Sequence, residues 1–276
     1  MVSALTNRWL LVCLFCVILA RPAFGDPPLV FRPSSPPSAS PLIINAAQQS
    51  NPRNWPATFY MTSAKGPCTS TIVGPRVILT AAHCVPPGGG GLGAQGTLES
   101  GTSSITVHCF TDPGYQSQTA TANKDLAVCI ADDVDIPIPY DGGYERIVLN
   151  ASVPIALQPV RLIGYGCRRE LGGGPDGELW DGQAFRDSNP VGPTDAIVLS
   201  RGAAACFGDS GGGSYLETNA TRRVIVGVVS RSNLTDTTYV ARIGADTDTG
   251  FFNEITHKHG ASVCGRDPPL DPRCHP

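Results

Sequence analysis

CFGDSGGG, at residues 206–213, places Ser210 between glycines and directly after an acid. Glycine adopts backbone conformations that other residues resist, so this stretch can hold the serine on a tight turn beside backbone N–H donors. A serine nucleophile is presented in this way. Glycine-rich turns also occur without any chemistry, so the meaning of Ser210 depends on the partners that the rest of the chain supplies.

Two further stretches contain the partners that a serine nucleophile requires. Small residues lead from an apolar strand into His83 in the string LTAAHC, and Asp125 stands directly before the apolar segment Leu126-Ala127-Val128. An acid at the mouth of a strand can be buried against an imidazole and fix its tautomer, and the imidazole can then accept the serine proton. Taken singly, His83 fits a core histidine and Asp125 a strand-end cap. Together with Ser210 they indicate a catalytic triad.

Through these strings the chain resembles the chymotrypsin-like (trypsin family) serine peptidases, from about residue 43 to about residue 263. The resemblance rests on T-A-A-H-C at His83, N-x-D-[IL] at Asp125, G-D-S-G-G at Ser210 and the chain order His, Asp, Ser. It implies an all-β fold, in which two six-stranded antiparallel β-barrels enclose the active site between them and a short C-terminal helix follows. It also implies a serine endopeptidase that forms an acyl-enzyme on Ser210, with His83 as general base and Asp125 orienting it.

The resemblance assigns roles to the neighbours of Ser210 as well. The backbone N–H groups of Gly208 and Ser210 would form the oxyanion hole. In the family, the acid at Asp209 pairs with an α-amino group that is released when a propeptide is cut, and Ile43-Ile44-Asn45-Ala46 resembles that new N-terminus. Leu42 stands where a basic residue is usual, which argues against activation by a trypsin-like enzyme. Cleavage between Leu42 and Ile43 is the hypothesis.

The residues that resemble the family's primary specificity pocket depart from the trypsin pattern. Ala204, six residues before the serine, stands where trypsin-like enzymes have the aspartate that binds Lys or Arg. Ser230 aligns with a serine that lines the pocket and supports the buried aspartate, while Arg231 and Ser232 replace the usual Trp and Gly. With Thr237 as a further wall residue, we predict a small or medium uncharged residue before the scissile bond.

The N-terminus resembles a secretory signal peptide at residues 1–25. Arg8 precedes an apolar run over residues 9–20, and Ala23-Phe24-Gly25 has small residues at the two positions that a signal peptidase needs. Its removal leaves an even number of cysteines in an exported chain, which favours disulfides. The resemblance gives one pair, and the others are proposed from it and from position: Cys68–Cys84, Cys109–Cys129, Cys167–Cys206 and Cys264–Cys274. A secreted protein, extracellular or periplasmic, is expected.

Composition and spacing limit the partners and the domain plan. The net charge of −3 gives no reason to expect nucleic acid, and an apolar run of about a dozen residues is too short for a membrane span of roughly 20. His257, His259 and His275 lack further ligands, so no metal or cofactor is expected. Protein or peptide substrates, protein protease inhibitors and a monomeric state are expected.

The domain plan follows from composition shifts along the chain. A Pro/Ser-rich leader or propeptide, expected to be extended and poorly ordered, occupies residues 26–42. The peptidase domain covers 43–265, with the first barrel at about 43–150 and the second at about 151–265, and 266–276 is a tail. Short β-branched runs between 31 glycines and 25 prolines favour β structure, and Phe251, Phe252 and Ile255 at helical spacing predict the helix.

Two other interpretations stay open from the sequence. An α/β-hydrolase esterase would use Ser210 in a G-x-S-x-G turn with a later acid and His257 or His259, but it requires an alternation of strands and helices that the chain lacks. A catalytically weak or inactive homologue would act as a binding module. Arg231 and the absence of the cysteine that usually pairs with Cys206 indicate a diverged cleft, whereas the complete triad argues for activity.

Overall fold

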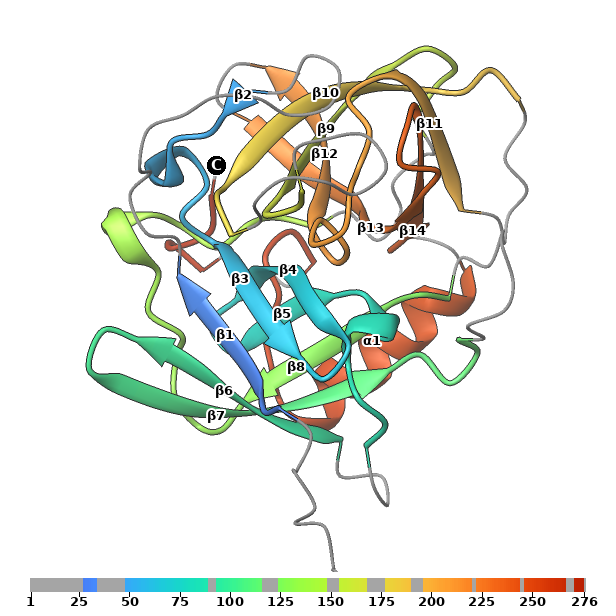
Figure 1. Cartoon of the computed structure of the whole chain (residues 1–276). Coiled ribbons are helices and arrows are strands. Elements are labelled where there is room, and N and C mark those ends of the chain that lie inside the picture. The colour runs from blue at the N-terminus through green and yellow to red at the C-terminus, as the bar shows by residue number, and fades with distance from the viewer. Residues whose placement is uncertain are drawn as a thin grey trace, which may run out of the picture.

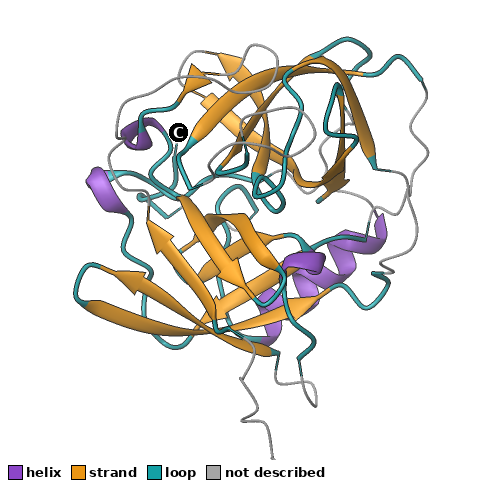
Figure 2. Ribbon diagram, viewed as in Figure 1, coloured by secondary structure: helices purple, strands orange, loops and turns teal. Residues whose placement is uncertain are grey.

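Two closed β-barrels make up most of the part of the chain that this computed structural model describes. The first barrel lies below the second in Figure 1, and Figure 2 shows that strands account for most of both. The predicted all-β class with two barrels is confirmed. The residues described are 27–33, 48–88, 93–115, 124–147, 154–167, 177–189, 196–219, 222–243, 246–266 and 271–275.

The first barrel closes through seven strands in the order β1-β3-β4-β5-β8-β7-β6. Neighbours pair antiparallel, except that β1 runs parallel to β6. Alternation sets the inward face, as in β7, where Ile105, Val107 and Cys109 are buried and the residues between them are not. The strands are β1 (Leu29–Pro33), β3 (Thr58–Ser63), β4 (Gly66–Gly74), β5 (Val77–Thr80), β6 (Ala94–Ser100), β7 (Ser103–Thr111) and β8 (Ala127–Ala131).

Strand β1 comes from the segment that the sequence predicts to be a poorly ordered leader. It fills the space between β3 and β6, with Leu29, Val30 and Phe31 all buried. The prediction of disorder is therefore wrong for residues 29–33, and the predicted first barrel is one strand short. Three consecutive apolar residues are enough to bury a short strand, even though the prolines and serines around them dominate the composition.

The second barrel has the predicted six strands, in the order β11-β14-β13-β12-β9-β10, and a further pairing of β10 with β11 closes it. A two-residue strand, β2 (Gln48–Gln49), adds to the outside of β10. The six strands are β9 (Pro159–Gly164), β10 (Trp180–Arg186), β11 (Ile197–Gly202), β12 (Gly213–Asn219), β13 (Arg222–Ser232) and β14 (Thr237–Arg242).

The predicted C-terminal helix is present as α1 (Asp246–Lys258). Phe251, Phe252 and Ile255 are buried in an apolar cluster that also contains residues of β5 and β8, so the helix packs on the first barrel. Gly260 has a φ of +57°, the left-handed conformation in which helices commonly end. Three short 3-10 helices complete the described elements: η1 (Pro52–Asn54), η2 (Ala82–Cys84) and η3 (Pro139–Asp141). None of the helices in the described ranges has the length and hydropathy needed to cross a membrane.

Four disulfides join the same cysteine pairs that the sequence analysis expected. Two lie within the first barrel, Cys68–Cys84 beside η2 and Cys109–Cys129 between the paired strands β7 and β8. The Cys167–Cys206 disulfide links two loops of the second barrel, and Cys264–Cys274 fixes the C-terminal tail to the first-barrel core.

Candidate active site

The first barrel holds His83 and Asp125 against each other. Strands β5 and β8 pair antiparallel with Thr80 opposite Ala127, so the residue after one strand and the residue before the other meet at the same edge of the barrel. The His83 Nδ1 atom lies 2.7 Å from Asp125 Oδ2, and the His83 backbone N–H donates to Asp125 Oδ1 at 2.9 Å. An ionised carboxylate only accepts hydrogen bonds, so the proton resides on Nδ1 and Nε2 is left as an acceptor.

The second barrel also binds the Asp125 carboxylate. The Ser230 hydroxyl, near the end of β13, donates to Asp125 Oδ2 at 2.6 Å. The buried carboxylate thus accepts three hydrogen bonds, two from His83 and one from Ser230. Buried carboxylate oxygens need hydrogen-bond donors, and both barrels supply them, so both barrels hold Asp125 in place.

Ser210 lies on a turn between β11 and β12 that only glycine can form at two positions. Gly208 and Gly211 have φ values of +103° and +82°, and a Cβ atom at Gly211 would collide with Thr80 Oγ1 and the Thr69 carbonyl oxygen. Strand β4 of the first barrel anchors the turn, because the Thr69 N–H donates to the Ser210 carbonyl at 2.8 Å and the Thr69 hydroxyl donates to the Gly208 carbonyl at 2.7 Å.

The backbone N–H groups of Gly208 and Ser210 are left available on this turn. Within the described residues neither of them has a hydrogen-bond acceptor, although the carbonyls of both residues are bonded to Thr69. Two unpaired backbone donors on a turn are the groups that stabilise a developing oxyanion. No motif marks Thr69, which holds these donors in place from the other barrel.

Asp209 lies directly before the serine and is only partly exposed. Its Oδ1 accepts a hydrogen bond from the Gly166 N–H and its Oδ2 accepts one from the Cys206 N–H, each at 2.8 Å. Burial raises the pKa of Asp209 to about 6, and the two backbone hydrogen bonds oppose that rise. No cation among the described residues pairs with this carboxylate. Ile43, its expected partner, lies outside the described residues.

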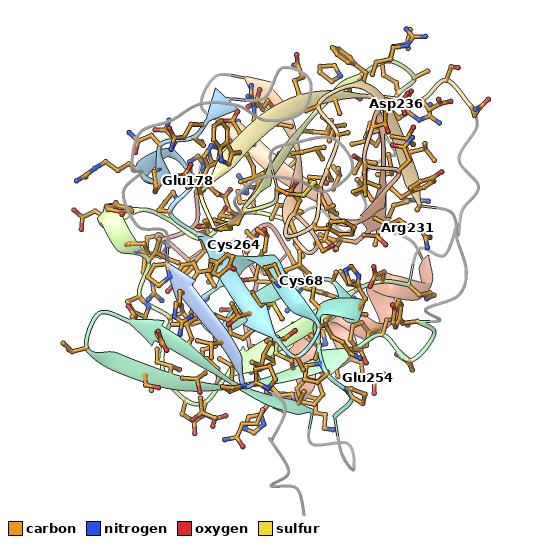
Figure 3. All side chains as sticks on the ribbon, in the orientation of Figure 1. Cys68, Glu178, Arg231, Asp236, Glu254 and Cys264 are labelled. Carbon is orange, nitrogen blue, oxygen red and sulfur yellow. A yellow bond between two sulfur atoms is a disulfide. The ribbon has the colours of Figure 1, made fainter. Side chains whose placement is uncertain are left out.

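A cavity of about 460 Å³ opens beside His83 and Ser210, between the two barrels. Of the residues predicted to form the pocket, Ser230, Arg231 and Ser232 line it, and Figure 3 shows Arg231 where the second barrel faces the first. Ala204 is buried behind it, beside a smaller cavity, and Thr237 is not among the lining residues.

Ala205, the residue after Ala204, lines the cavity. The Ala205 N–H donates to the hydroxyl of Thr238 at 2.9 Å, and Thr238 is fully buried and does not line the cavity itself. The β13–β14 pairing places Ser232 opposite Thr238, a register that spacing alone does not reveal.

The described residues give one group with metal-ligand geometry, and it does not fit a metal. Its members are Cys68, His83 and Cys84. Both cysteine sulfurs are joined in a disulfide, so they are not the thiolates that bind metal ions, and His83 is bonded to Asp125.

Comparison with known proteins identifies the family. The family model described as Trypsin matches residues 43–246. The chain belongs to the trypsin family. This family member is a serine endopeptidase, a hydrolase that acts on protein or peptide substrates, and its four disulfides and family suggest an extracellular protein.

Among solved structures, that of a Glu endopeptidase in complex with MPD superimposes on this chain with a TM-score of 0.56 at 20% sequence identity. The superposition covers 78% of this chain and 100% of the Glu endopeptidase chain, and it shows that the two share a fold. A comparison with curated protein sequences gives no match.

Proposed function

We propose that this trypsin-family member is a secreted endopeptidase that cuts peptide bonds with Ser210 as nucleophile, His83 as general base and Asp125 as its orienting acid. The observation that carries the proposal is the 2.7 Å contact from His83 Nδ1 to Asp125 at the edge of the cavity that Ser210 also lines. Because the imidazole proton is held on Nδ1, the lone pair of Nε2 is free to accept a proton from the serine.

The reaction follows from these groups. His83 Nε2 takes the Ser210 proton as the oxygen attacks the substrate carbonyl carbon, and the Gly208 and Ser210 N–H groups receive the oxyanion. The tetrahedral intermediate collapses, the peptide C–N bond breaks, and His83 gives its proton to the leaving amine. A water molecule then repeats the sequence on the acyl-enzyme, releases the carboxylic acid and restores Ser210.

For the residue before the scissile bond we propose a small or medium uncharged side chain. The support is the lining of the cavity, which includes Ala205 and contains no acidic residue among the described residues. Lys or Arg would lack a carboxylate there. Cleavage after Ala or Val should exceed cleavage after Arg in short peptides.

Activation and export are also proposals. Cleavage between Leu42 and Ile43 would produce an α-amino group. The Asp209 carboxylate, which among the described residues is bonded only to two backbone N–H groups, would accept that cation. N-terminal sequencing of active protein should begin at Ile43.

We further propose a signal peptide at residues 1–25, a monomer, and protein protease inhibitors as partners. The all-β fold does not favour the esterase alternative, and the His83–Asp125 contact does not favour an inactive binding module.

The decisive experiment uses Ser210→Ala with a peptide library read by mass spectrometry. We expect kcat to fall by about 10⁶ in this variant, because the nucleophile is lost. Ser104→Ala is the matched control, since Ser104 is an exposed serine of β7 outside the cavity, and it should cleave like the parent. Equal cleavage patterns from Ser210→Ala and the parent protein would refute the proposal.

A further inference from the structure

The cavity beside Ser210 has basic side chains on both of its walls. Lys65, in the turn between β3 and β4, comes from the first barrel, and Arg231, near the end of β13, comes from the second. Among the described residues that line the cavity, none is acidic. The whole chain has 20 Lys and Arg against 23 Asp and Glu, so this local excess of positive charge is not a general property of the surface.

Arg231 lines the cavity and has no carboxylate partner among the described residues. Its guanidinium only stacks over the ring of Tyr239, and its Nε is buried with no hydrogen-bond acceptor among the described residues. Asp236, the nearest acid along the chain, bonds Asn233 and Thr237 instead, and Figure 3 shows it well separated from Arg231. The arginines that do pair with carboxylates include Arg32, Arg76, Arg161, Arg223 and Arg273.

A substrate carboxylate is the group that completes this site. A guanidinium offers donors in a planar fork that a carboxylate matches with two hydrogen bonds, and these charge-assisted bonds are stronger than neutral ones. A substrate with a neutral aliphatic side chain would cover the guanidinium without offering it an acceptor, so the site discriminates against it. Ala205, an uncharged lining residue of the same cavity, lies in a different segment from Arg231.

We propose that Arg231 is a specificity-determining residue that binds an acidic side chain of the substrate, at a position other than the one directly before the scissile bond. Lys65 adds a weaker attraction, because it is exposed and its charge is screened by solvent. The substrates are acidic peptides in which a small residue precedes the bond that is cut. This inference deepens the proposed function and rests on it.

The test uses pairs of quenched fluorescent peptides that differ only by Glu or Gln, scanned through four positions on each side of one scissile bond. At one position we expect kcat/KM to be at least about tenfold higher for Glu than for Gln. Arg231→Gln should reduce that ratio to near one, and Arg231→Lys should keep part of it. Lys65→Met should lower the ratio about twofold, whereas Lys258→Met, which removes an exposed cation at the end of α1, should leave it unchanged.

A binding measurement separates this proposal from the proposed catalysis. The Ser210→Ala protein should bind the favoured Glu peptide at least about tenfold more tightly than its Gln partner, and Ser210→Ala with Arg231→Gln should bind both alike. Equal binding of Glu and Gln peptides at every position, or an acidic preference that survives Arg231→Gln, would overturn the role of Arg231. Binding with the acidic preference but without serine-dependent cleavage would refute the proposed function and leave the acidic site standing.

Discussion

The two barrels make different contributions to one site. The first barrel places His83 and Asp125 at the ends of two directly paired strands, above a core that includes the aromatic side chains of Phe31, Phe59 and Tyr144. One apolar cluster of the second barrel is aliphatic, although Trp180 and Tyr215 of this barrel are also buried, and the barrel presents Ser210 on a glycine turn and forms most of the cavity. The proposed general base therefore lies beside the ends of paired strands, while the proposed nucleophile lies on a turn.

The barrels also differ in what closes them. The second barrel is closed by strands that all lie within residues 43–246, the range that matches the Trypsin family. The first needs β1, which lies before that range and before the proposed cleavage site. The first barrel, which holds His83, thus depends on strand β1, and the proposed cleavage would break the covalent link between β1 and the rest of that barrel.

The largest expected effect is a loss of kcat when Asp125, which holds the His83 imidazole, is replaced, and it is compared with the loss when Ser230, which holds Asp125, is replaced. Asp125→Asn should lower kcat by about 10⁴, because an amide in its place stabilises the wrong tautomer of His83. Ser230→Ala removes one of three hydrogen bonds to the carboxylate and should lower kcat only about 10- to 100-fold. Steady-state kinetics on one peptide measures both. Equal losses would mean that the second barrel positions the acid as strongly as the first.

The second prediction concerns the strand that only the first barrel has. Phe31→Ala should lower the free energy of unfolding by about 3–5 kcal/mol, because the ring is fully buried between β3 and β6. Val226→Ala, in the aliphatic cluster of the second barrel, should cost about 2 kcal/mol. Urea unfolding followed by tryptophan fluorescence compares the two variants. A smaller loss from Phe31→Ala would mean that β1 is dispensable to the barrel.

The same strand predicts the fate of the leader after cleavage. Its pairing with β3 and β6 does not require the peptide bond at Leu42–Ile43, so the peptide that contains β1 should remain with the cleaved protein under native conditions. Intact and denaturing mass spectrometry of active protein should detect the peptide only after unfolding. Active protein purified without it would show that the first barrel closes in another way.

The residues proposed to carry the chemistry could be named from the sequence, because each proposed role demands one residue type and the motif strings contain it. His83, Asp125 and Ser210 lie as the strings imply, and the eight cysteines pair as expected. Strand β1 was missed because the segment around it is rich in Pro and Ser, which predicts disorder. Its three apolar residues become ordered only because the barrel provides strands β3 and β6 to bury them. The cavity is lined by Ala205 and not by Ala204 or Thr237, because lining depends on how the loop before Ser210 and strand β14 face the cavity, which spacing along the chain does not reveal.

The third prediction concerns the pH dependence of stability that Asp209 causes. Asp209 has a pKa of about 6 in the folded protein against an ordinary value of 3.8, so the folded state binds the proton first as the pH falls. Stability of uncleaved protein should therefore decrease as the pH rises from about 4 to about 6, by on the order of 3 kcal/mol in total. Urea unfolding at several pH values should reveal this decrease in the parent relative to Asp209→Asn, which cannot titrate.

Cleavage should remove that pH dependence. An α-amino group next to Asp209 would lower the pKa of its carboxyl, so ionisation would no longer oppose folding. The measurement is the same unfolding series on cleaved protein. An unchanged slope between pH 4 and 6 would contradict the proposed pairing with Ile43, whereas Asp125, which already has three donors, is unaffected by cleavage.

The smallest effect is expected at the surface of the β1–β6 pair. Arg32 and Glu99 form a hydrogen-bonded ion pair at 2.7 Å, but both side chains are nearly half exposed, so water and salt screen their attraction. Arg32→Met should shift Tm by no more than about 2 °C and leave kcat unchanged, with a still smaller shift in high salt. Thermal unfolding of Arg32→Met, Glu99→Gln and the double variant gives the coupling between them. A shift as large as that of Phe31→Ala would mean that charge rather than burial holds β1 in the barrel, and the closure of the first barrel would then weaken with ionic strength while that of the second would not.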